Sequence, residues 1–178
     1  MTARRPDSRG LFADAEVAAV LRLQAMAARP AAWRGALLLS RAGEHALGWV
    51  ALGLAGAALD ARQRRSWLRA TAAVAGAHAL SVGLKRLVRR PRPSDPRILV
   101  RLAPPGRWGF PSSHAASTAA AAVAYSSLLG RRLPLASIPL MMASRVVVGL
   151  HYPSDVLAGA VLGGAVGRWA RRRTPGRS

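Results

Sequence analysis

The chain has 178 residues, which suits one domain or one small helical bundle. It contains no cysteine, so disulfide bonds and thiolate metal sites are excluded. A net charge of +20 would suit a nucleic-acid-binding protein, but only 5% of the residues are aromatic and 51% are hydrophobic, so few rings could stack on bases. The arginines cluster between apolar stretches and do not follow one helix face, which favours a membrane protein without a nucleic-acid partner.

The N-terminal region differs from the rest in its charge pattern. Residues 1–10 are polar and basic, and we expect a flexible N-terminus without a cleaved signal peptide. Over residues 11–28, apolar side chains such as Val17 and Val20 alternate with charged ones such as Glu16. This pattern is typical of an amphipathic helix, and it suits a helix in the membrane interface better than a membrane span.

Five later stretches are apolar and have about 17–25 residues, the length that crosses a bilayer as a helix. They cover residues 36–59, 67–88, 112–130, 133–150 and, approximately, 154–170. In the last stretch Gly159, Gly163 and Gly167 place a glycine stripe on one helix face, which favours close packing against a neighbouring helix. We therefore predict an all-α fold: an integral membrane bundle of about five transmembrane helices plus the N-terminal interfacial helix.

The only lysine of the chain, Lys85, stands near the end of the second of these stretches. Pro91 and Pro93 prevent the helix from continuing, so Lys85 should project from a helix end and Arg92 from the loop that follows. An ammonium point charge and a planar guanidinium together can hold phosphate oxygens from two directions. Taken alone, the pair could equally be an interface anchor, as basic residues beside a span usually are.

A second cluster adds hydroxyl and imidazole groups. Pro111 and Ser112 indicate a helix start, with Ser112 as its cap and Ser113 and His114 in the first turn. Free backbone N–H groups at a helix start favour a bound phosphate. His114 could donate a proton to a leaving oxygen there, or it could be structural.

The third cluster lies between two helix ends. Ser144 and Arg145 stand near the end of the fourth stretch, and His151 and Asp155 open the fifth. The Asp155 carboxylate can accept a hydrogen bond from one imidazole nitrogen of His151 and leave the other free to attack phosphorus. A helix-cap pair, with Ser144 hydrogen-bonded locally, is the alternative.

The three clusters together resemble the three signature motifs of the PAP2 (type 2 phosphatidic acid phosphatase) superfamily. The matching residues are Lys85-x6-Arg92-Pro93, Pro111-Ser112-Ser113-His114 and Ser144-Arg145-x5-His151-x3-Asp155. Ser113 stands where glycine is commoner in the family, but this position is expected to supply a backbone N–H. The resemblance implies a PAP2-like bundle, with residues 11–170 as one transmembrane catalytic domain and residues 171–178 as a basic C-terminal tail.

The resemblance also implies a role for each motif residue. His151 would be the nucleophile that forms a phosphohistidine, Asp155 would orient it, and His114 would protonate the leaving group and later activate water. The phosphate ligands would be Lys85, Arg92, Arg145, Ser112 and Ser113. No metal or other cofactor is implied, and the sequence agrees, because Asp95 and Asp155 are the only acidic residues after residue 60.

Three further polar residues are candidates for the substrate pocket, namely His78, Ser81 and Glu44. His78 and Ser81 precede Lys85 by seven and four positions on the same helix face, and ionisable residues within a span are often functional. Glu44, next to His45, should lie on the membrane face that carries the site. These residues could contact a substrate head group, although His78 could instead pack and Glu44 could pair with a loop arginine.

The resemblance implies a membrane lipid-phosphate phosphatase whose substrate is a phosphomonoester or a diphosphate, in a multi-pass form that suits a bacterial inner membrane. The alanine and arginine bias indicates a GC-rich genome, such as that of an actinobacterium. The resemblance to short members of the superfamily in that setting implies a polyprenyl-linked substrate of the decaprenylphosphoryl-5-phosphoribose type. Undecaprenyl diphosphate and phosphatidylglycerophosphate are alternative substrates, and a non-catalytic basic membrane scaffold is an alternative function. The chain could also form a homo-oligomer. Its arginines are divided almost evenly between the two predicted membrane faces.

Overall fold

The computed structural model describes residues 8–104 and 106–172, which form helices and one isolated β-bridge between Pro91 and Trp108. The longer helices are α1 (Ser8–Met26), α2 (Pro30–Ala42), α3 (Leu47–Leu59), α4 (Arg64–Val88), α5 (Ser113–Leu129), α6 (Ser137–Val147) and α7 (Pro153–Arg172). Short 3₁₀ turns are η1 (Glu44–Ala46), η2 (Ala61–Gln63) and η3 (Leu133–Ala136). The all-α prediction is confirmed, whereas most of the expected flexible N-terminus and basic tail lies outside the described residues.

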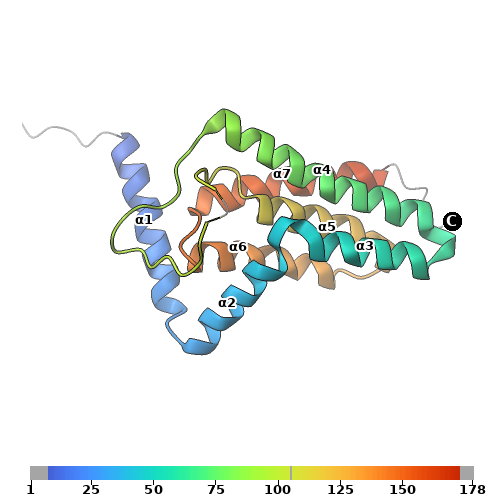
Figure 1. Ribbon diagram of the computed structural model, residues 1–178, viewed down its shortest axis with the longest axis horizontal. Coiled ribbons are helices and arrows are strands. Elements are labelled where there is room, and N and C mark those ends of the chain that lie inside the picture. The colour runs from blue at the N-terminus through green and yellow to red at the C-terminus, as the bar shows by residue number, and fades with distance from the viewer. Residues whose placement is uncertain (1–7, 105, 173–178) are drawn as a thin grey trace, which may run out of the picture.

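Helices α3 to α7 run along one another as an elongated bundle, and α1 crosses one end of it (Figure 1). α5 is the central helix, since it contacts α4, α6 and α7 and buries almost all of its side chains. Its composition explains this position, because its many alanines and serines let neighbouring helices approach closely. Near the start of α4, Trp67 packs against Tyr125 of α5 with ring centroids 5.3 Å apart.

The predicted glycine stripe of α7 packs against the backbone of α5. A Cβ atom added to Gly159, Gly163 or Gly167 would meet the carbonyl oxygen of Ser112, Ala116 or Ala120, respectively. The two backbones therefore lie closer together than any larger residue at these positions would allow. The packing interpretation of the stripe is confirmed, and the contact fixes the start of α5 against the start of α7.

The first predicted span, residues 36–59, is not one helix. It is divided between α2 and α3 by η1, where His45 and Ala46 adopt the left-handed conformation with φ of 53° and 61°. Residues other than glycine rarely adopt this conformation, and two in succession interrupt the helical hydrogen bonds. The prediction of a continuous helix is wrong here, because apolar composition does not reveal a local change of backbone dihedral angles.

The fourth predicted span is shorter than expected. Pro134 lies in η3 and Pro139 in the first turn of α6, so the regular helix covers only Ser137–Val147 of residues 133–150. Among the described residues, no single helix is both long enough and apolar enough to cross a bilayer. The number of membrane spans therefore stays a prediction.

The N-terminal helix forms close to its predicted position and docks on the bundle. It buries Glu16, Val20 and Gln24, which recur every four residues on one face, and it exposes Leu11 and Phe12. Val20 packs with residues of the α4–α5 connection, α6 and α7. The buried face of α1 is thus largely polar, and the charged and amide groups on it contact the rest of the protein.

The closeness of α5 and α7 leads to a prediction about stability. Gly163→Ala should lower the free energy of unfolding by about 1–3 kcal/mol, the usual cost of overpacking, because the added methyl group meets the carbonyl of Ala116. In Gly76→Ala of α4, the matched control, the added Cβ has no described atom within 4 Å. That variant should be neutral or more stable by up to about 1 kcal/mol. Unfolding in mixed detergent micelles, followed by circular dichroism, measures both, and equal stabilities would contradict the predicted packing.

Candidate active site

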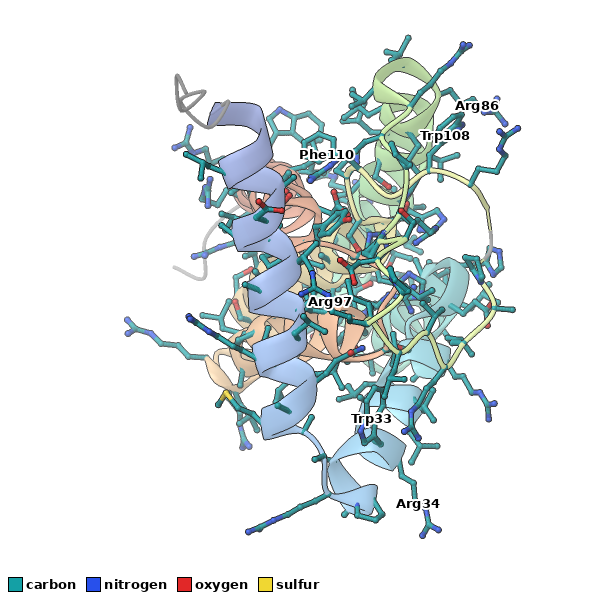
Figure 2. All side chains as sticks on the ribbon, turned by 90° about the vertical axis from the view of Figure 1, so that its left-hand side faces the viewer. Trp33, Arg34, Arg86, Arg97, Trp108 and Phe110 are labelled. Carbon is teal, nitrogen blue, oxygen red and sulfur yellow. The ribbon has the colours of Figure 1, made fainter. Side chains whose placement is uncertain are left out.

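A cavity of about 800 Å³ opens where α4, α5, α6 and the α4–α5 connection meet. It is lined by residues of all three predicted clusters, namely Lys85, Arg92, Ser113, His114, Arg145 and His151. In Figure 2 the labelled Arg86 and Trp108, which also line the cavity, lie together at the loop end of α4. The structure thus brings the three clusters together at one site, as their separate positions at helix ends predict.

Lys85 is positioned by the end of α4. The helix stops before Arg89, whose left-handed conformation turns the chain into the proline-rich connection. The Lys85 ammonium donates to the carbonyl oxygens of Trp108 and Gly109, at 3.4 and 3.2 Å. The lysine therefore leaves the helix and faces the returning arm of the connection.

Arg92 joins the connection to His151. Its Nε donates to the Gly106 carbonyl at 2.7 Å, and its Nη1 donates to the Leu150 carbonyl at 2.8 Å. Nη1 also lies 3.1 Å from Nε2 of His151. A guanidinium can only donate hydrogen bonds, so Nε2 is the unprotonated ring nitrogen and the proton of the neutral imidazole is on Nδ1.

Arg145, in the last turn of α6, is 1% exposed. Its Nε and Nη2 have no hydrogen-bond partner among the described residues, and the same holds for the hydroxyl of Ser113. A buried guanidinium with unused donors is costly unless an anion satisfies it. These donors line the cavity together with Lys85 and Arg92, so the site is built to receive an anion with several oxygens.

The start of α5 places Ser112, Ser113 and His114 in different roles. Ser112 caps the helix, as predicted, since its hydroxyl accepts from the N–H of Ala115 at 3.5 Å. The Ser112 side chain is buried and does not line the cavity, so the structure does not bring this expected phosphate ligand to the site. Ser113 and His114 both line the cavity.

His114 is held by a backbone group that the sequence does not reveal. Its Nε2 lies 3.1 Å from the carbonyl oxygen of Ser40 in α2. Because a carbonyl only accepts, Nε2 carries a proton, and Nδ1 is the nitrogen that can exchange one with a substrate. Ser40 also meets Ser144, with their hydroxyl oxygens 3.3 Å apart, and Ser144 donates locally to Met141 at 3.1 Å.

Asp155 lies in the first turn of α7 and is fully buried. Its Oδ2 lies 3.5 Å from Nδ1 of His151 and accepts from the N–H of Tyr152 at 3.0 Å. The other carboxylate oxygen, Oδ1, accepts from Nη1 of Arg90 at 2.9 Å. The motifs do not single out Arg90, because it stands at a variable position of Lys85-x6-Arg92-Pro93 in a run of arginines. The signal for it in the sequence is its place two residues before Arg92.

Burial lowers the pKa of His151 well below its usual value of 6.5, and the nearby positive charges of Arg145, Arg92 and Lys85 lower it further. His151 lies in the loop between α6 and α7, next to these three cations. The imidazole is therefore neutral at pH 7, which is the state a nucleophilic nitrogen requires.

The three candidates for the substrate pocket do not share one location. Glu44 and His78 line the cavity together with His45, whose ring centroid is 6.4 Å from that of His78. Ser81 does not line it, because it is buried and its hydroxyl donates to the His78 carbonyl one turn earlier, at 2.6 Å. The assignment of Ser81 to the pocket is therefore wrong, since a serine in a helix can bond to its own backbone.

The positive charges of the site come from side chains of lysine and arginine. Across residues 8–104 and 106–172, no group of three or more His, Cys, Asp or Glu side chains is placed to hold a metal ion. The arrangement can bind an anion from several directions, and it places a neutral imidazole nitrogen and a second histidine at the same cavity.

Comparison with known proteins identifies the family of the chain and several of its relatives. Residues 66–177 match the PAP2 superfamily. The chain is 50% identical over 135 residues to the decaprenylphosphoryl-5-phosphoribose phosphatase of Mycolicibacterium smegmatis, which covers 76% of this chain and 75% of that protein. It is 46% identical over 153 residues to the protein of the same name from Mycobacterium tuberculosis, which covers 85% of this chain and 86% of the relative.

A solved structure has the same fold. The crystal structure of a transmembrane PAP2 type phosphatidylglycerolphosphate phosphatase from Bacillus subtilis matches with a TM-score of 0.71 and 20% identity, over 89% of this chain and 85% of that chain. The superfamily match covers more than half of the chain and contains every motif residue from Lys85 to Asp155. The chain therefore belongs to the PAP2 superfamily and is a phosphatase of the PAP2 type.

Proposed function

We propose that this protein is a membrane-embedded lipid-phosphate phosphatase in which His151 forms a phosphohistidine. The observation that carries the proposal is the buried Arg145, whose unused donors face a cavity shared with Lys85, Arg92 and the unprotonated Nε2 of His151. Three cations from three segments can neutralise the charge of a phosphoryl group without a metal ion.

The proposed reaction has two steps. In the first, the cations bind the phosphate oxygens, Nε2 of His151 attacks phosphorus, and the bond to the leaving oxygen breaks. With the phosphate bound, His114 enters this step as an imidazolium with protons on both ring nitrogens, gives its Nδ1 proton to the leaving oxygen and becomes neutral with its proton on Nε2. In the second, His114 takes a proton from water, which attacks the phosphohistidine and releases inorganic phosphate. Nη1 of Arg92 contacts Nε2 of His151, the atom proposed to attack, so binding of the substrate must move this guanidinium onto the phosphate.

The proposal places the bundle in a bacterial cell membrane as a multi-pass protein, with the cavity at headgroup depth. Large apolar side chains on the outer surfaces of α3, α6 and α7 are exposed, including Leu52, Leu54, Leu59, Leu140, Leu157 and Val161. An extended apolar surface of this kind on a protein with a polar site suits contact with lipid chains. The name of the transmembrane B. subtilis relative supports the same placement.

The reaction is tested by phosphate release from a panel of lipid phosphates in detergent micelles. We expect the wild-type protein to release inorganic phosphate, and we expect His151→Ala to lower kcat by about 10³-fold or more because the nucleophile is lost. His114→Ala should lower kcat by about 10²- to 10⁴-fold, the usual contribution of general acid–base catalysis. Phosphate release that persists in His151→Ala would refute the phosphohistidine, and an inactive wild-type protein would favour the scaffold alternative.

The protonation state of His151 is tested by NMR. The chain has four histidines, so ¹⁵N-histidine labelling gives a simple spectrum, and a His151→Gln variant assigns the signal. Since burial and three cations lower its pKa, the imidazole should remain neutral as the pH falls through 6.5 and should gain its proton only in more acidic solution. A midpoint at or above pH 6.5 would contradict the neutral nucleophile.

For the substrate, we infer a polyprenyl-linked lipid whose phosphate is attached to a sugar. The two mycobacterial relatives are named for decaprenylphosphoryl-5-phosphoribose, and the cavity extends past the cations to Glu44, His45 and His78. His45 and Ala46 adopt the left-handed backbone conformation beside this end of the cavity. Backbone strain of this kind is usually kept where function requires it. A carboxylate beside a phosphate site repels the phosphate, but it can accept hydrogen bonds from sugar hydroxyls.

The substrate inference predicts a selective effect of Glu44→Ala. The Michaelis constant for a phosphoribosyl polyprenyl lipid should rise by about tenfold, because a hydrogen bond to a charged group is worth about 1.5–3 kcal/mol. The constant for undecaprenyl diphosphate, which has no sugar, should stay the same or fall because a negative charge is removed. Asp14→Ala, which removes an exposed carboxylate of α1, is the control. A similar rise for both lipids would argue against a sugar-binding role and leave the phosphatase proposal intact.

A further inference from the structure

Asp155 is held by Arg90, which stands at a variable position of the first motif and is not among the residues that define it. Nη1 of Arg90 donates to Oδ1 of Asp155 at 2.9 Å and also contacts the hydroxyl of Ser154. The guanidinium lies over the ring of Tyr152, 4.9 Å from its centroid. Arg90 does not line the cavity, so it holds Asp155 without facing the space proposed for the substrate.

The second end of the Arg90 guanidinium is bound by the N-terminal helix. Nη2 forms an ion pair with Oε2 of Glu16 in α1. The other Glu16 oxygen, Oε1, accepts from the backbone N–H of Ser154 at 3.0 Å. Glu16 is only 6% exposed, although it is a charged residue in a terminal helix. It thus contacts both Arg90 and the first turn of α7.

The position of Arg90 in the connection is itself fixed. The N–H of Gly109 donates to the Arg90 carbonyl at 2.8 Å, and an isolated β-bridge joins Pro91 to Trp108. The two arms of the α4–α5 connection are therefore tied together beside α7. Arg90 and Arg92, two residues apart in the connection, contact different members of one pair, since Arg92 contacts His151 and Arg90 contacts Asp155.

This arrangement prevents an unproductive pairing. Lys85 and Arg92 are close enough to Asp155 to interact with it electrostatically. If the carboxylate turned toward either of them, it would neutralise a cation that the phosphate needs and would move away from Nδ1 of His151, which now lies 3.5 Å from Oδ2. With Oδ1 bound to Arg90 and Oδ2 bound to the Tyr152 N–H, the carboxylate stays beside the imidazole.

We propose that Arg90, clamped by Glu16, is a positioning residue that holds the Asp155 carboxylate on His151, so that α1 takes part in organising the active site. This inference rests on the proposed function, because it assigns Arg90 and Glu16 to the phosphohistidine reaction. Arg90 stands at one of the variable positions of the first motif and Glu16 lies outside all three motifs and outside the segment that matches the superfamily.

The test is a double-mutant cycle of Arg90→Gln with Asp155→Asn, with kcat and KM measured on the lipid that the wild-type protein hydrolyses best. Arg90→Gln alone should lower kcat by about 10- to 100-fold, as loss of groups that orient reactive histidines does at metal sites. KM should change by less than about threefold, because Arg90 does not line the cavity. In the Asp155→Asn background, Arg90→Gln should change kcat by less than about threefold, since the carboxylate it positions is gone.

Two further variants separate positioning from loss of folding. Arg90→Lys keeps the charge but loses the planar fork, so it should recover only part of the lost kcat. Glu16→Gln should lower kcat by about three- to tenfold, and this loss should also vanish in the Arg90→Gln background. Arg97→Gln is the matched control, because Arg97 is in the same connection, is 67% exposed and pairs only with Asp95 among the described residues, so its loss should leave kcat unchanged.

The outcomes distinguish the inference from the proposed function. A loss of kcat in Arg90→Gln that is equally large with and without Asp155 would mean a general structural role and would overturn the inference. An unchanged kcat in Arg90→Gln would overturn it as well. In both cases, lipid hydrolysis by the wild-type protein and its loss in His151→Ala would still support the phosphatase.

Discussion

The contact between the backbones of α5 and α7 determines where the reactive groups stand. The N–H of Ser112 donates to the Asp155 carbonyl at 2.9 Å, and Gly159 packs directly on the Ser112 carbonyl. The helix start that carries His114 and the helix start that carries Asp155 are therefore joined with no side chain between them. Since His151 precedes α7 by two residues, its distance from His114 is set by the same contact. Small residues in both helices are thus a condition for the site, as well as for the fold.

The cations of the site are held mostly by backbone carbonyls. Lys85 donates to two carbonyls of the α4–α5 connection, and Arg92 donates to one in the connection and one before α7. A carbonyl dipole orients a cation without cancelling its charge, whereas a carboxylate would neutralise it. Arg90 shows the contrast, because it pairs with Glu16 and Asp155 and does not line the cavity. The choice of partner thus separates the cations proposed to bind phosphate from the arginine proposed to orient the carboxylate.

The sequence was sufficient to predict most of the side chains that meet at the cavity, because they lie at helix ends whose positions proline and serine mark. Lys85, His114 and His151 meet at one cavity, as their spacing implies. The partners of these groups could not be predicted, because they are backbone atoms, such as the Ser40 carbonyl, or residues brought close only by the fold, such as Glu16. The break at His45 was also missed, since an apolar stretch looks the same whether the backbone is helical throughout or turns once.

The N-terminal helices α1 and α2 support the site from outside its cavity, although they precede the superfamily segment. The Gln24 side chain donates to the carbonyls of Leu99 and Val147 and accepts from the Leu99 N–H. The guanidinium of Arg101 lies 4.2 Å from the centroid of the Trp33 ring. These contacts hold the α4–α5 connection, which carries Arg92, against α1, α2 and α6. The alignment with the M. tuberculosis relative spans 153 residues, so it extends into this N-terminal region. The superfamily core therefore supplies the reactive groups, and the N-terminal helices keep the connection in the position that the reaction needs.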